Sequence, residues 1–162
     1  MTQTTIELFL EMLSAERGAA QATLKNYQRD LEDFAGFACR KGTAVAMADT
    51  GTVRDYLASM SWAGLAASTA ARRLSVLRQF YSFLYAEGLR DDDPCVAVEG
   101  PRRTRPLPKV LNEGEVELLL DEARKKSGAD GARLVALMET LYATGLRVSE
   151  LVTLPLSVAT PG

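Results

Sequence analysis

Apolar residues in the first ninety positions recur at the spacing of amphipathic helices. The first stripe has an i, i+3, i+4, i+7 pattern and consists of Ile6, Phe9, Leu10 and Leu13. Similar stripes predict helices over about residues 22–40, from Thr50 or Thr52 to about residue 60, and over about 68–87. Gly42 and Gly88 follow the second and fourth stripes, where glycine commonly ends a helix. Trp62 lies in the turn after the third helix, and we expect it to pack between helices.

A second helical domain is predicted over residues 111–162, after a linker at 91–110. Asn112 and Glu115 have the spacing of a capping box, which favours a helix start at Asn112. This helix is expected to end before Gly128, and the next runs over 132–143. A short helix follows Gly145 until Pro155 stops its growth. The apolar positions of the last two helices are Leu134, Leu137, Met138, Leu141, Leu151, Val152 and Leu154. The pattern therefore predicts an all-α protein with a four-helix domain over residues 1–90.

Composition narrows the possible functions. The net charge is −2, so DNA binding would require a local basic surface. The chain has no histidine, which excludes a histidine general base, a Ser–His pair and a histidine-ligated metal. Cys39 and Cys95 lack CxxC spacing and are expected to be free thiols, so neither a metal nor a cofactor is expected. No apolar run reaches membrane-spanning length and no signal peptide is evident, so we expect a cytoplasmic protein.

The fourth predicted helix carries candidate nucleic-acid contacts opposite its apolar stripe. That face collects Ser68, Arg72, Ser75, Gln79 and Ser82, flanked by Arg73 and Arg78. The sequence has no acidic residue between Asp55 and Glu87. Arginines, hydroxyls and an amide can bind phosphates and base edges in the major groove of DNA. The alternative interpretation is that this face of the helix is basic and simply exposed to solvent.

Basic residues on the second predicted helix and in the linker are further candidates for DNA contacts. Lys25 and Arg29 lie opposite the apolar stripe of the second helix. In the proline-rich linker, Arg103, Arg105 and Lys109 suit a segment that crosses a phosphate backbone. A solvated tether is the alternative for the linker.

The segment Leu141–Leu151 contains the candidate for phosphate chemistry. Gly145 ends one helix and Arg147 falls in the first turn of the next, where free N–H groups attract anions. Glu150, three residues on, can orient the guanidinium of Arg147. The alternative is an exposed ion pair on a turn between two core helices.

The string ATGLRVSEL, residues 143–151, resembles the first catalytic-arginine motif of the tyrosine recombinases, most closely the Xer subfamily of this phage integrase family. The first domain supports the resemblance. Its matching positions are Thr23, Tyr27, Asp30, Leu31 and Phe34, and then Arg72–Ser75, Leu77-Arg78, Phe80-Tyr81, Leu84, Glu87-Gly88, Asp92 and Asp93-Pro94. The resemblance implies a SAM-like core-binding domain at 1–90, followed by the first helices of a catalytic domain at 111–162. It implies that Arg147 contacts the scissile phosphate and that Glu150 supports it.

The resemblance also implies an activity and partners. Members recombine duplex DNA at specific sites, as in chromosome dimer resolution, with a tetramer of protomers on two DNA sites. A tyrosine attacks a phosphodiester without a metal, and arginines stabilise the developing charge. The family places a lysine, a His-x-x-Arg motif and the nucleophilic tyrosine after the position matching Gly162. We therefore expect a fragment that binds DNA without cutting it, with residues from about 110 onward loosely packed. A stand-alone DNA-binding module and a helical protein-interaction domain are the alternatives.

Overall fold

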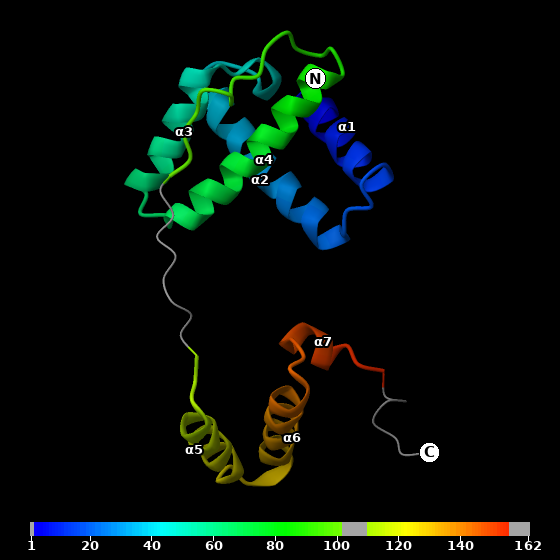
Figure 1. Ribbon diagram of the computed structural model, residues 1–162, viewed down its shortest axis with the longest axis vertical. Helices are drawn as coiled ribbons and strands as arrows, with labels where there is room; N and C mark the ends of the chain where they lie inside the picture. The colour runs from blue at the N-terminus through cyan, green and yellow to red at the C-terminus, as the bar shows by residue number, and fades with distance from the viewer. Residues whose placement is uncertain (1, 102–109, 156–162) are drawn as a thin grey trace. The chain divides into compact units, whose positions relative to one another are not determined.

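The regular elements of the protein are helices throughout the described part, as the sequence predicts (Figure 1). The computed structural model describes residues 2–101 and 110–155. These residues fall into two compact units, one before and one after the segment 102–109. Each unit has its own packing.

The first unit contains the four predicted helices. They are α1 (Thr2–Ala15), α2 (Gln21–Arg40), α3 (Thr50–Trp62) and α4 (Ala67–Ala86), with a short 3-10 helix, η1 (Val45–Met47), between α2 and α3. Aromatic side chains fill the centre: Phe9, Phe34 and Phe80 have no exposed surface. The Tyr81 hydroxyl is also buried and donates to the carbonyl of Val45 at 2.6 Å, which satisfies its polar atom inside the core.

Helix ends in this unit follow local sequence signals. Gly42 and Gly88 adopt φ values of +79° and +65° just after α2 and α4, as the sequence predicts. Glycine suits these positions because a Cβ atom disfavours positive φ. At the start of α3, the Asp49 carboxylate accepts from the backbone N–H of Thr52 at 2.8 Å. This cap fixes the start of α3 at Thr50.

The chain after α4 completes the same core. Pro94, Cys95 and Val98 are buried, and the backbone N–H of Cys95 donates to Asp93 at 2.8 Å. Burial raises the pKa of the Cys95 thiol to about 12. The compact part of this unit therefore continues beyond residue 90.

The prediction for Trp62 is wrong. Its side chain is 91% exposed at the last residue of α3, instead of packing between helices. Met60 takes the inward position of this turn and is 3% exposed. Because only one side of a helix can face the core, Trp62, two residues on, points away from it.

The second unit is made of α5 (Glu113–Arg124), α6 (Gly128–Thr144) and α7 (Val148–Val152). The predicted capping box at Asn112 and Glu115 is present. Helix α6 begins at Gly128, one turn before the predicted residue 132. Gly145 has the expected left-handed conformation with φ +67°, and its N–H donates to the carbonyl of Leu141 at 2.9 Å.

Little of this second unit is buried. Among its described residues only Ala123 and Gly131 fall in the buried class. The apolar side chains at the predicted stripe positions are half-buried or exposed, and Val152 is 65% exposed. The described helices of this unit therefore form with almost no buried interior.

Candidate nucleic-acid interface

Helices α2 and α4 adjoin through polar side chains as well as through the core. Gln79 Nε2 donates to the Tyr27 hydroxyl at 2.9 Å, and Arg72 on α4 pairs with Asp30 on α2. The predicted contact residues on these helices are exposed, except for the half-buried Gln79 and Arg73. We call the α2–α4 face the set Lys25, Arg29, Ser68, Arg72, Ser75, Arg78 and Gln79.

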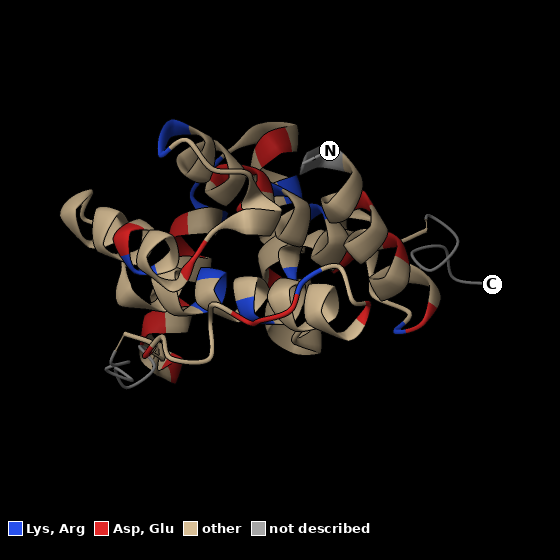
Figure 2. Ribbon diagram, turned by 90° about the horizontal axis from the view of Figure 1, so that it is seen from above, with Lys and Arg blue, Asp and Glu red and all other residues tan. Residues whose placement is uncertain are grey.

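Acidic residues reach α4 from another helix. The sequence of α4 lacks acids, but folding brings Asp30 and Asp33 of α2 against its arginines. Basic and acidic positions are consequently interspersed over the helices (Figure 2). The stretch of sequence without acidic residues between Asp55 and Glu87 therefore does not give an acid-free surface around Arg72 and Arg73, because a linear sequence does not show which helix packs beside which.

Arg73 is held inside a polar network. Its Nη1 forms an ion pair with Asp33 and donates to the Tyr56 hydroxyl at 2.8 Å, and its side chain is 18% exposed. The Tyr56 hydroxyl in turn donates to Asp33 at 2.7 Å. Burial, followed by the hydrogen bond to Asp33, raises the pKa of Tyr56, so the phenol stays protonated. Arg73 thus joins α2, α3 and α4, and its guanidinium is turned toward the protein.

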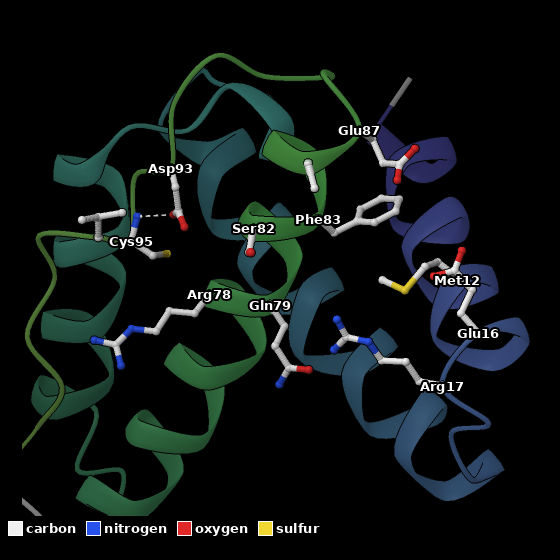
Figure 3. A pocket seen from close by; sticks show the side chains of 12 residues that line it. Met12, Glu16, Arg17, Arg78, Gln79, Ser82, Phe83, Glu87, Asp93 and Cys95 are labelled. Atoms are coloured by element: carbon white, nitrogen blue, oxygen red, sulfur yellow. Dashed lines mark hydrogen bonds between the residues drawn. The ribbon is translucent and has the colours of Figure 1, made fainter.

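Arg78 and Gln79 line a groove of about 550 Å³ between α1, α4 and the segment 93–96 (Figure 3). Arg78 Nη2 donates to the carbonyl of Val98 at 2.7 Å. In the view of Figure 3, the Gln79 amide lies between the guanidinium groups of Arg78 and Arg17. Acidic side chains, Glu16, Glu87 and Asp93, also line the groove, so its charge is mixed.

Arg17 is a candidate contact that the sequence pattern did not indicate. It follows α1 immediately before Gly18, where the sequence shows only a helix ending. The fold brings it beside residues of α4 that are more than sixty positions away in sequence. No spacing rule links such residues, so only the tertiary structure identifies Arg17.

The linker candidates Arg103, Arg105 and Lys109 lie outside the described residues. The prediction that they contact a phosphate backbone therefore rests on the sequence alone.

Arg147 and Glu150 adjoin as predicted, although Arg147 is the N-cap of α7 and precedes its first turn. One Glu150 oxygen accepts from the Arg147 backbone N–H at 2.7 Å, and the other accepts from Arg147 Nη1 at 2.9 Å. The Arg147 side chain is 82% exposed. Glu150 thus orients the guanidinium while leaving most of its donors free for an anion.

Two further observations concern the described residues only. No group of His, Cys, Asp and Glu side chains in them is arranged to hold a metal ion. None of their helices is both long enough and apolar enough to cross a membrane.

Comparison with known proteins identifies close relatives. The tyrosine recombinase XerD of Rhizobium meliloti is 52% identical over 164 residues, covering 98% of this chain and 53% of the relative. The protein of the same name from Caulobacter vibrioides is 49% identical over 150 residues, covering 93% of this chain and 49% of the relative. The chain therefore spans about half the length of the curated relatives it matches.

Solved structures show the same fold at lower identity. A lambda integrase dimer bound to a COC' core site matches with a TM-score of 0.70 and 23% identity, over 99% of this chain and 43% of that one. The integrase of mycobacterium phage Brujita matches with a TM-score of 0.58 and 19% identity, over 91% and 47%. Residues 6–88, more than half of the chain, match the family model described as phage integrase, N-terminal SAM-like domain. The protein therefore belongs to the phage integrase family of tyrosine recombinases.

Proposed function

We propose that this chain is the DNA-binding part of a Xer-type recombinase that acts at specific sites in duplex DNA, as in chromosome dimer resolution. The α2–α4 face lies against the major groove, and Arg147 contacts the scissile phosphate with Glu150 in support. The observation that carries the proposal is the run of exposed cationic and hydroxyl groups on two adjoining helices. Such groups bind phosphates and base edges. The partners are a duplex recombination site and further recombinase protomers, in the cytoplasm.

Residues of the α2–α4 face and its surroundings have different roles in this proposal. Lys25 and Arg29 are exposed and contact the phosphate backbone, and Arg29 makes a 3.2 Å hydrogen bond to Asn26. Neutral hydrogen-bond donors and acceptors for the major groove of the DNA come from Ser68, Ser75 and Gln79. Arg73 supports this surface from beneath, because its guanidinium already bonds Asp33 and Tyr56. Arg103, Arg105 and Lys109 add phosphate contacts from the linker.

Binding is tested with charge reversals on α2. Arg29→Glu should weaken binding to duplex DNA. It should also make the negative slope of the logarithm of the binding constant against the logarithm of the salt concentration less steep by about 1 or more. Arg40→Glu is the matched control, because Arg40 is exposed on the same helix about 16 Å further along its axis. Equal losses for the two variants would contradict the placement on the α2–α4 face.

Chemistry is tested with a nicked duplex that traps covalent intermediates. The 162-residue polypeptide should bind this DNA without forming an adduct that survives SDS. It has no histidine, and its tyrosines at 27, 56, 81, 85 and 142 precede Arg147. An SDS-stable adduct would overturn this part of the proposal and would direct attention to Tyr142, the tyrosine nearest Arg147 in sequence.

A further inference from the structure

Asp30 is the only charged residue in the buried class within the described part of the chain, and it is 2% exposed. Burying a carboxylate is costly unless cations and hydrogen bonds compensate it. Two arginines of α4 do so: Arg72 through both Nη atoms, and Arg73 with its Nε at 3.7 Å. The buried carboxylate on α2 therefore fixes the Arg72 guanidinium through two hydrogen bonds, whereas Arg73 Nε is only an ion-pair neighbour and makes no hydrogen bond within the described residues.

The guanidinium groups of Arg72 and Arg73 differ in how many of their N–H donors are already bonded within the described residues. Arg73 is also bonded to Asp33 and Tyr56, and its side chain is 18% exposed. Among the described residues Arg72 pairs with Asp30, and its side chain is 44% exposed. Helix α4 also presents exposed Ser68 and Ser75 one turn to either side of Arg72.

The geometry of a guanidinium decides which donors Arg72 can still offer. Its five N–H groups form a rigid planar fork. Asp30 takes the edge formed by Nη1 and Nη2. The other two-donor edge, formed by Nε and the second hydrogen of Nη2, makes no hydrogen bond within the described residues. This edge presents two parallel donors in a fixed orientation.

We propose that Asp30 holds Arg72 so that its Nε–Nη2 edge reads a guanine in the major groove of the bound DNA, through O6 and N7. Arg72 is then a specificity-determining residue and Asp30 its positioning residue. The inference rests on the proposed function, because it requires the α2–α4 face to contact DNA.

Two physical arguments favour a base over a phosphate as the ligand. Pairing with Asp30 neutralises much of the Arg72 charge, so its long-range attraction to phosphates falls while its directional donors remain. Holding the side chain also removes rotamer freedom before binding, which favours a contact with one fixed geometry. A bidentate arginine–guanine pair is a contact of this kind.

The test is a selection of preferred sequences from a random duplex library by the full chain and three variants. The wild type should enrich a guanine at one position. Arg72→Lys keeps the charge but cannot offer two parallel donors, so it should lose that preference on the order of 10-fold. Asp30→Asn keeps the side-chain size while removing the charge, and it should weaken the same preference with Arg72 intact. Arg29→Ala is the control and should lower affinity for all sequences while keeping the preference.

Each outcome is distinguishable. If the wild type binds no duplex DNA, the proposed function fails and this inference fails with it. If the wild type binds but Arg72→Lys retains the guanine, or loses affinity equally on every sequence, Arg72 is not a base reader and only this inference is overturned. Circular dichroism melts establish that each variant is folded. Arg72→Lys decides the question even if Asp30→Asn unfolds, because a lysine can still pair with Asp30.

Discussion

Long helices of the two units, α4 with 20 residues and α6 with 17, differ in what their apolar side chains contact. In the first unit, α4 buries Leu74, Leu77 and Phe80 against α1, α2 and α3. In the second unit, α6 is nearly as long, yet Leu134 is 37% exposed and Tyr142 is 60% exposed. Short helices are marginal in water, so most helical stability comes from packing an apolar face. A periodic pattern of apolar residues is therefore enough to form a helix. A buried core forms only where the apolar face of each helix packs against other helices.

The largest difference is expected in amide hydrogen exchange. The core of α4 should exchange only through global unfolding of the first unit, whereas α6 should open at several kcal/mol lower cost. Exchange measured by mass spectrometry on the monomeric chain tests this. Limited proteolysis should likewise leave a resistant product that ends near residues 100–108. Equal protection of residues 134–143 and 68–87 would remove the distinction between the units.

A matched pair of leucine truncations sharpens the comparison. Leu77 is 1% exposed, so Leu77→Ala should destabilise the chain by about 2–5 kcal/mol through lost burial and a residual cavity. Leu118 on α5 is 68% exposed, and Leu118→Ala should change stability by about 0.5 kcal/mol or less. Urea denaturation followed by circular dichroism measures both. A cost for Leu118→Ala close to that of Leu77→Ala would show that α5 buries this side chain in solution.

Glycine substitutions give the next largest effect. A Cβ at Gly131 in α6 would lie 1.8 Å from the Lys126 carbonyl oxygen, so Gly131→Ala must displace the turn between α5 and α6. We expect a destabilisation of about 1–3 kcal/mol in the second unit. Gly36→Ala in α2 is the control, because its Cβ would meet only the Arg40 side chain at 3.7 Å. Alanine should stabilise α2 by about 0.5–1 kcal/mol there. If thermal melts show a higher melting temperature for both variants, the turn between α5 and α6 accommodates the Cβ of residue 131 without strain.

The smallest effect concerns the helix caps of the two units. Hydrogen bonds from the backbone and side chain of Thr52 lower the pKa of Asp49 below its ordinary value. The stability that this cap contributes is therefore complete above about pH 4. It is lost as the pH falls through the lower pKa of the folded state. Asn112 caps α5 with an amide that does not titrate.

Asp49→Asn tests the cap effect. The variant should remove this acid-dependent part of the stability of the first unit, measured as the melting temperature across pH 2–5. An unchanged pH profile would show that other carboxylates dominate acid unfolding.

Helix positions could be predicted from sequence because the signals that set them are local. The stripe spacing, the capping pair Asn112–Glu115 and the glycines after α2, α4 and α6 act within a few residues. The adjacency of Arg147 and Glu150 was predictable for the same reason, since three residues separate them.

Only the tertiary structure decided which side chains meet across helices. Arg72 and Arg73 stand in an acid-free stretch of sequence, yet the packing of α2 beside α4 gives them Asp30 and Asp33 as partners. The same packing places Arg17 beside α4. Trp62 lies outside the core because the interior beneath α3 is filled by Tyr56 and Met60. Helix formation depends on neighbours in the chain, whereas charge pairing and burial depend on neighbours in space. The sequence therefore determined the helices and the family, and the fold determined which of its arginines pair with carboxylates and which side chains stay exposed.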